Sequence, residues 1–221
     1  MMRPSSVRLR VCPILLAPVV AALAWMSPVK AEPANYRIDP VHTRVVFAVD
    51  HYEFSRALGA LSGATGTLRF DSEDWTTASV EVTIPLGRLD LGDQKWNTRM
   101  LKADFFAVAE HPSARFVSTR IEPIDATHAT IFGTLTLRGV SKEVRLQATL
   151  NGRGRHPLTL RRTVGFSATA TLSRADFGMR AWKSAIGDSV TLIIEVEASR
   201  ARRAEKDTPA PRHSGEVRNP S

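Results

Sequence analysis

Cysteine is almost absent from the 221 residues, because the sequence contains only Cys12 near its beginning. We expect the segment around Cys12 to be removed, so the remaining chain has no disulfide, no thiolate metal site and no cysteine nucleophile. Aromatic residues make up only 7% of the chain and form no girdles of the kind that mark outer-membrane barrels. The protein must therefore be stabilised by an ordinary apolar core.

Catalytic and metal-binding motifs are also scarce. None of the histidines forms a His-x-x-x-His or His-Glu-x-x-His pair with the spacing of metal ligands, so we expect no metal site and place them on the surface or in turns. They are His42, His51, His111, His128, His156 and His213. No paired carboxylates share a polar motif, and no glycine-rich loop opens a helix.

Half of a hydrolase triad can be imagined in Asp39 and His42, which lie close together before a strand. The segment Gly165-Phe166-Ser167-Ala168-Thr169 only approaches a nucleophile elbow, and it lies inside a strand pattern instead of at a strand-to-helix turn. We interpret Ser167 as an ordinary strand serine, and the residues indicate a protein that is not an enzyme.

The N-terminus resembles an export signal. Three arginines precede an apolar stretch at residues 11–26, which is short for a membrane span and broken by two prolines. Val29-Lys30-Ala31 then places small residues before a cleavage point ahead of Glu32. The sequence thus predicts a removable signal at residues 1–31 and no permanent membrane span.

The formal charge of +8 and a pI near 10.3 suggest, at first, a nucleic-acid partner. Residues 1–31, however, hold four basic residues and no acid, and residues 200–221 hold six basic residues and three acids. Subtracting four and three from eight leaves +1 for residues 32–199. We therefore expect one nearly neutral domain at 32–199, a disordered tail at 200–221 and no nucleic-acid partner.

Two-residue alternation of apolar and polar residues runs through the whole domain and predicts β-strands. The clearest alternation lies at 79–86, 143–150 and 189–198. Weaker patterns lie at 44–49, 65–71, 115–121, 128–138 and 162–173, after a short leading segment at 36–38. Turn residues at 71–74, 122–123, 138–139 and 151–154 separate the strands, and we assign Gly59, Gly63 and Gly66 to turns or bulges.

One short helix interrupts the strands at residues 92–102. Trp96 and Met100 are four residues apart, and Asp93 is a suitable N-cap. Short connections favour an antiparallel meander, which buries its apolar face in a sandwich or a closed barrel. Alternation alone does not distinguish a barrel filled by side chains from one that holds a small ligand.

Five motifs in order resemble the YceI-like family, which comprises bacterial, mostly periplasmic, lipocalin-like proteins that bind polyisoprenoids. The motifs are Tyr36 to Thr43, Asp104-Phe105-Phe106 followed by His111-Pro112 and Phe116-Val117-Ser118, Gly133 to Lys142, Gly165-Phe166 through Arg174 to Met179, and Ile186 to Val190. The resemblance covers about residues 35–198.

This resemblance implies an all-β, eight-stranded antiparallel lipocalin-like barrel with one short helix near one end, located in the periplasm. Its apolar tunnel would take an isoprenoid quinone, a polyprenyl phosphate or another long-chain amphiphile, without a cofactor, and a homodimer is left open. The residues that we expect to contact the ligand are Phe47, Phe70, Ile84, Phe106, Phe116 and Phe166 in the tunnel and Met100 at its mouth.

Two departures from the family pattern bear on the ligand. Leu61 and Ala64 stand where aromatic residues are frequent, and their smaller side chains would reshape the cavity. Trp96 and Asn97 replace an Arg-Asp pair of the helix, which favours a neutral or quinone-like head group. Three hypotheses follow: a carrier of an isoprenoid lipid, a hydrolase that uses His42 or His51, and an interaction module with a filled core.

Overall fold

The computed structural model describes residues 33–201, so the expected signal at 1–31 lies outside the described residues. The strands are β1 (Ala34–Ile38), β2 (Arg44–His51), β3 (Ser55–Ser62), β4 (Thr65–Phe70), β5 (Ser79–Pro85), β6 (Leu89–Asp90), β7 (Ser113–Pro123), β8 (His128–Leu137), β9 (Val140–Arg155), β10 (Arg162–Ser173) and β11 (Ile186–Arg200). One α-helix, α1 (Gln94–Met100), and three 3₁₀ turns at Trp75–Thr77, Leu86–Arg88 and Ala175–Phe177 complete the described elements.

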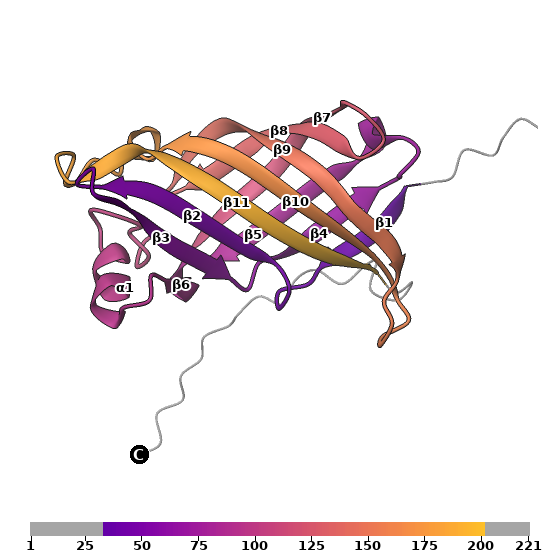
Figure 1. Ribbon diagram of the computed structural model, residues 1–221, viewed down its shortest axis with the longest axis horizontal. Coiled ribbons are helices and arrows are strands. Elements are labelled where there is room, and N and C mark those ends of the chain that lie inside the picture. Colours follow the sequence, from indigo (N-terminus) through magenta and orange to yellow (C-terminus); the bar gives the residue numbers. More distant parts are fainter. Residues whose placement is uncertain (1–32, 202–221) are drawn as a thin grey trace, which may run out of the picture. The chain divides into compact units, whose positions relative to one another are not determined.

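The strands form a closed antiparallel barrel (Figure 1). Eight of them follow one another around the ring in the order β1, β4, β5, β7, β8, β9, β10 and β11, and β11 pairs again with β1. Closure satisfies the backbone groups that an open sheet would leave at its edges. The prediction of an eight-stranded antiparallel barrel with one short helix is confirmed.

One edge of β11 is shared by two strands. Residues 186–195 of β11 pair with β2, and residues 198–200 pair with β1. The corner between β1 and β2 is fixed by Asp39, whose backbone oxygen accepts a hydrogen bond from Thr43 N at 3.0 Å. The next two strands follow the same division, since β3 pairs with β2 and β4 pairs with β1. The break between β3 and β4 lies at Gly63, whose φ of +77° suits glycine.

The glycine assignments were partly wrong. Gly59 lies inside β3 and Gly66 inside β4, and only Gly63 occupies a turn. Phe47 covers Gly59 from the neighbouring strand and fills the space of a missing side chain. The turn expected at 151–154 is also wrong, because β9 continues to Arg155 and the chain reverses at residues 156–161. A register shift between Gly165 and Phe166 of β10 accommodates this longer strand.

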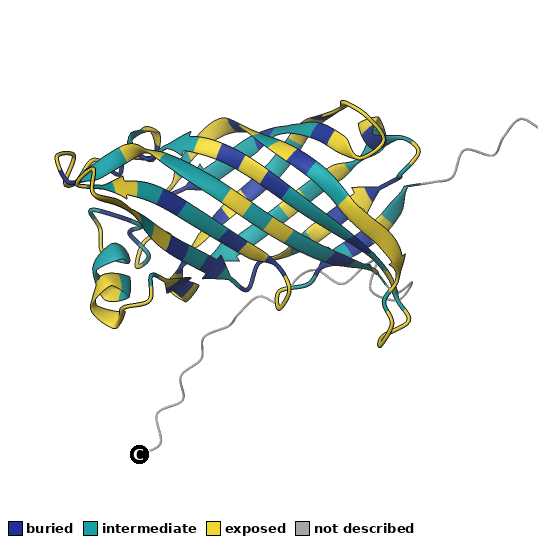
Figure 2. Cartoon of the chain, in the orientation of Figure 1, coloured by how far each residue is buried: buried dark blue, intermediate teal, exposed yellow. Residues whose placement is uncertain are grey.

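Side chains alternate between the interior and the surface along each strand (Figure 2). In β11, Val190, Leu192, Ile194 and Val196 line internal cavities, while Glu195 accepts a hydrogen bond from Ser167 of β10 on the outside. β11 also extends to Arg200, the first residue assigned to the tail; residues 202–221 lie outside the described range.

Helix α1 lies at the end of the barrel where β2 turns into β3 (Figure 1). The Asp93 carboxylate accepts a hydrogen bond from Trp96 N at 2.9 Å, as expected for an N-cap. Asn97 accepts a hydrogen bond from Leu91 N at 2.8 Å and thereby ties the helix to the segment after β6. Within residues 33–201, no helix is long and apolar enough to cross a bilayer.

Candidate ligand-binding tunnel

Two internal cavities follow one another inside the barrel. The first, of about 200 Å³, lies at the end covered by α1 and is bordered by Met100, Phe105 and Met179. The second, of about 150 Å³, lies toward the opposite end and is bordered by Phe70, Trp75 and Phe166. An apolar cavity of about 150 Å³ takes a molecule of the size of benzene, so the core of this barrel is not filled.

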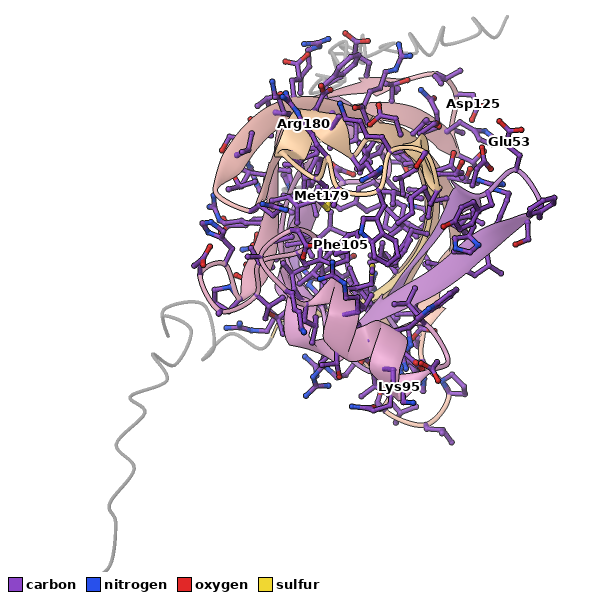
Figure 3. The ribbon with its side chains drawn as sticks, turned by 90° about the vertical axis from the view of Figure 1, so that its left-hand side faces the viewer. Glu53, Lys95, Phe105, Asp125, Met179 and Arg180 are labelled. Atoms are coloured by element: carbon purple, nitrogen blue, oxygen red, sulfur yellow. The ribbon has the colours of Figure 1, made fainter. Side chains whose placement is uncertain are left out.

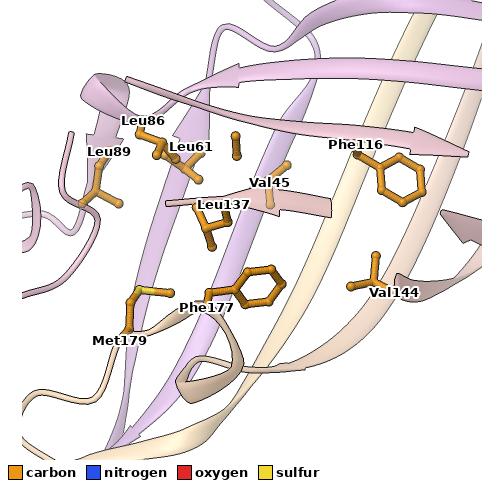
Figure 4. Packing of buried hydrophobic residues seen from close by; sticks show 10 residues of the cluster. Val45, Leu61, Leu86, Leu89, Phe116, Leu137, Val144, Phe177 and Met179 are labelled. Atoms are coloured by element: carbon orange, nitrogen blue, oxygen red, sulfur yellow. The ribbon is translucent and has the colours of Figure 1, made fainter. Parts of the chain in front are cut away.

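The two cavities adjoin, because several inward-facing side chains border both of them. These shared residues form a waist between the cavities: Val45, Ile84, Leu135, Leu172 and Leu192. A cluster of buried residues surrounds the first cavity, with contributions from β2, β3, β8 and the segment after β10 (Figure 4). The cavities therefore adjoin across the waist, and we refer to the two cavities and the waist together as the tunnel.

All seven residues expected to contact a ligand border this tunnel. Phe47, Met100 and Phe106 border the first cavity, Ile84 belongs to the waist, and the second cavity has Phe70, Phe116 and Phe166. The structure thus places these seven residues on the tunnel wall, and their contact with a ligand stays a prediction. Leu61 and Ala64, which stand where the family frequently has aromatic residues, also border the tunnel. Leu61 borders the first cavity and Ala64 the second.

Several aromatic residues of the tunnel are not among those predicted from the sequence. Trp75 and Trp182 were not selected because each lies in a connection without periodicity, and Phe105 was quoted only as part of a motif. For Trp75, the available signal is a tryptophan within a polar turn, since such a large apolar surface is rarely left in water. Trp75 is in fact only 5% exposed, and Trp182, by contrast, is 53% exposed.

Aromatic residues border the first cavity at its mouth beside α1, and Figure 3 shows Phe105 and Met179 at this opening of the barrel. Arg99 of the helix lies over the ring of Phe105 at 5.1 Å and over that of Trp182 at 5.4 Å. Its guanidinium also pairs with Asp104, with an Nη1–Oδ1 distance of 2.8 Å, and this hydrogen bond lowers the pKa of the Asp104 carboxyl. Arg99 thus connects the helix with both segments that border the mouth.

Arg174 is the buried cation of the first cavity, with 7% of its surface exposed. Its guanidinium donates four hydrogen bonds to backbone oxygens, at 2.7 Å to Met179, 2.9 Å to Ala181, 2.8 Å to Ile186 and 2.8 Å to Gly187. Burial lowers the pKa of Arg174, and the charge of Asp188 opposes this shift. The side chain therefore holds the loop that carries Trp182 to the mouth.

Polar and apolar residues are divided along the tunnel. Asp50, His51 and Arg174 border the first cavity, whereas Thr43 is the one polar residue that borders the second among the described residues. The ring of His51 lies 5.8 Å from that of Trp96, at the mouth. This division suits an amphiphile whose polar head stays at the mouth and whose apolar tail extends inward.

The far end of the tunnel is packed. Phe70, Trp75 and Phe166 contact one another edge to face, with ring centroids 5.0 to 5.8 Å apart. Behind them, Ala129 and Ala198 are fully buried. We call these three side chains the aromatic stop.

The candidate hydrolase residues do not form one catalytic site. His42 Nδ1 is 2.9 Å from Asp39 Oδ2. Glu197 lies beside this pair, and the oxygen and nitrogen atoms of the three side chains that could bind a metal ion lie within 4.8 Å of one another. Ser167 instead donates its hydroxyl to Glu195 at 2.7 Å and accepts a hydrogen bond from Asn151 at 2.8 Å. The Asp39–His42 pair is formed as imagined, but Ser167 is bonded elsewhere and does not complete a triad with it.

Comparisons with known proteins agree with this architecture. The model of the YceI-like domain matches residues 36–198. A UPF0312 protein of Pseudomonas paraeruginosa is 32% identical over 192 residues, which are 84% of this chain and all of the relative. Another, from Pectobacterium atrosepticum, is 33% identical over 171 residues, 76% of this chain and 88% of the relative.

Solved structures share the fold. The Campylobacter jejuni YceI protein superimposes with a TM-score of 0.63 at 26% identity, covering 69% of this chain and 90% of the other. A polyisoprenoid-binding domain from Saccharophagus degradans gives a TM-score of 0.57 at 15% identity, covering 77% of this chain and all of the other, and it supports the fold alone. With its closed barrel, its internal tunnel and a family model that spans nearly the whole described chain, this protein belongs to the YceI-like family.

Proposed function

We propose that the protein binds the tail of an isoprenoid lipid in the tunnel and carries or sequesters that lipid in the periplasm. The observation that carries this proposal is the second cavity, whose lining is apolar except for Thr43 and which adjoins the first cavity through the waist. Burial of apolar chain contributes roughly 0.8 kcal/mol per methylene group, so a long tail is held without a catalytic group.

The polar head of the lipid would lie at the mouth, near Arg174, Asp50 and His51. Four of the five guanidinium N–H groups of Arg174 donate to backbone oxygens, which leaves one donor and the positive charge. An acceptor oxygen suits this position, whether it belongs to a quinone carbonyl or to a phosphate. Export to the periplasm is proposed from the signal pattern at residues 1–31.

A binding protein agrees better with the described residues than the two alternatives. Among the described residues, His51 is the one histidine that borders either of the two cavities, and its ring packs against Tyr52 and Trp96. Neither of these neighbours is a serine or cysteine of the kind that ester hydrolases pair with a histidine. A barrel that serves only as an interaction module would have a filled core, and the two cavities are evidence against it.

The test begins with the mature protein purified from its native host. Organic extraction followed by mass spectrometry should release an isoprenoid amphiphile, and titration of the emptied protein with a ubiquinone analogue and a polyprenyl phosphate should show saturable binding. Absence of a co-purified amphiphile together with absence of binding would refute the proposal.

Two matched variants test whether the lipid binds inside the tunnel. Met100→Lys places a charge at the mouth of the first cavity and should weaken binding at least tenfold, because the ammonium group blocks or polarises the path of the tail. Thr98→Lys adds the same charge to the exposed side of the same helix and should leave the affinity unchanged. Equal affinities of the two variants would place the ligand elsewhere.

A further inference from the structure

The tunnel ends at three aromatic side chains that come from distant parts of the chain. Phe70 is the last residue of β4, Trp75 begins the 3₁₀ turn before β5, and Phe166 lies in β10. All three border the second cavity, and Trp75 lies edge-on to Phe70 at 5.0 Å and to Phe166 at 5.8 Å.

The 3₁₀ turn fixes Trp75 in this place. Asp74 caps the turn, accepting a hydrogen bond from Thr76 N at 3.1 Å, and Ala78 N donates to the backbone oxygen of Trp75 at 3.0 Å. The indole Nε1 is buried without a hydrogen-bond partner among the described residues. An unpaired buried donor costs stability, so the indole contributes here through its volume and ring contacts.

Beyond these rings, the described residues pack together without lining the cavity. Tyr36, Val164 and Ala198 belong to the same buried cluster but do not border the second cavity, and Val164 is only 2% exposed. The end of the tunnel is therefore solid apolar packing, which has low compressibility. Within the described residues, a tail that reaches the aromatic stop therefore meets buried side chains instead of a further stretch of the second cavity.

We propose that the aromatic stop of Phe70, Trp75 and Phe166 sets the longest isoprenoid tail that the tunnel can hold in extended form. This inference rests on the proposed function and adds a limit to it. The length of the tunnel and the volume of its cavities each give an estimate of the longest tail.

The length follows from β11. Ile186 borders the first cavity and Val196 the second, ten residues apart on one strand. At about 3.3 Å per residue and a tilt of about 40°, this strand advances at most roughly 25 Å along the barrel axis, because the irregularity between Ile186 and Val190 shortens it. An isoprene unit adds four chain bonds of about 1.5 Å, or roughly 5 Å of extended length. The tunnel therefore takes at most about five isoprene units.

The volume of the two cavities gives a smaller number of isoprene units than the tunnel length does. Cavities of about 200 Å³ and about 150 Å³ together hold somewhat more than two molecules of the size of benzene, or about fourteen carbon atoms, which corresponds to just under three isoprene units of five carbons each. Longer tails require movement of side chains at the waist, such as Leu135 and Leu172. We expect the affinity to stop rising between three and five units.

The experiment uses prenyl alcohols from two to eight isoprene units and measures their affinity by displacement of a fluorescent prenyl probe from the mature protein. For the native sequence, the affinity should rise at least about tenfold with each added unit and reach a plateau between three and five units. In Trp75→Leu and in Phe166→Leu, the plateau should shift by at least one unit to longer tails. Phe132→Leu, outside both cavities, is the matched control and should keep the native plateau.

Trp75→Leu also removes the unpaired indole N–H, which limits its cost to stability. Circular dichroism checks the fold of each variant, and Phe166→Leu decides the test if Trp75→Leu does not fold. A plateau that stays in place in the folded variant, or native affinity that rises through eight units, would overturn the limit while the proposed function stands. Failure of every prenyl alcohol to bind the native protein would refute the proposed function itself.

Discussion

Phe47 of β2 and Gly59 of β3 stand directly opposite each other, and the Phe47 ring occupies the space into which a side chain at position 59 would project. Such a pairing lets a large ring lie flat against a neighbouring strand. Because Phe47 also borders the first cavity, the absence of a side chain at Gly59 sets the shape of the tunnel.

Gly59→Ala should therefore destabilise the protein and constrict the tunnel. The added methyl group would push the Phe47 ring toward the first cavity, and overpacking of this kind costs about 1–3 kcal/mol. Chemical denaturation measures the loss. Gly152→Ala is the control, because a methyl group added there would meet no atom within 4 Å, and its free energy of unfolding should change by less than about 0.5 kcal/mol.

Arg174→Met should lower the free energy of unfolding by about 3 kcal/mol or more, since four backbone oxygens lose a charged donor. Arg174→Lys should restore only part of this loss, because a single ammonium group does not reproduce the planar set of donors. Urea denaturation of both variants provides the measurement. Full stability of the lysine variant would show that charge, and not hydrogen-bond geometry, is what the loop requires.

Asp93→Ala should cost about 1 kcal/mol, the usual effect of removing an N-cap. Without this cap, α1, which carries Trp96 and Met100 at the mouth, opens more often, so its amides should exchange faster with solvent in this variant. Hydrogen-exchange mass spectrometry of residues 94–100 tests this expectation. Exchange of β10 should stay at its native rate and serves as the internal reference.

The Asp39–His42 pair should make stability depend on pH. The hydrogen bond to Asp39 and the charges of Asp39 and Glu197 raise the pKa of His42, so its contribution is complete below the ordinary pKa near 6.5 and is lost as the pH rises through the folded value. Burial acts to raise the pKa of Asp39, but hydrogen bonds from His42 and Val41 outweigh it and lower that pKa.

The contribution of Asp39 is therefore present above about 3.8 and lost as the pH falls through its folded value. His42→Gln should consequently lose more stability between about pH 4 and 6.5 than at pH 9, as followed by thermal melting across this range. A difference between the native protein and the variant that does not change with pH would contradict the coupling.

Local signals were enough to predict most strands and the helix. Helix α1 is specified by the cap at Asp93 and by the spacing of Trp96 and Met100, all close together in the sequence. Strand β3 was missed because its inward positions include Ala57 and Gly59, whose small side chains conceal the alternation. Packing by Phe47 from the opposite strand supplies the missing apolar surface, and no property of β3 alone reveals it.

The candidate site was predicted in part, through the family resemblance. Residues such as Phe116 and Phe166 lie on the apolar face of their strands, so alternation places them inside. Whether the interior is filled depends on the summed volume of side chains that meet only in the folded barrel. Trp75 closes the tunnel because the fold brings it beside Phe166, ninety-one positions later in the chain, and no local pattern conveys such a contact.

At one end of the barrel, part of one edge of β3 has no paired strand among the described residues. β3 pairs with β2 along its whole length, but on its other side its only strand partner is β6, at Ala60 and Leu61. Its segment Ser55–Gly59 has no strand partner there among the described residues, and α1 lies beside this side of the barrel (Figure 1). At the opposite end, β1 joins β4 to β11 and completes the ring. Closure of the eight-stranded ring therefore depends on β1, and neither β3 nor α1 contributes a strand pair to it.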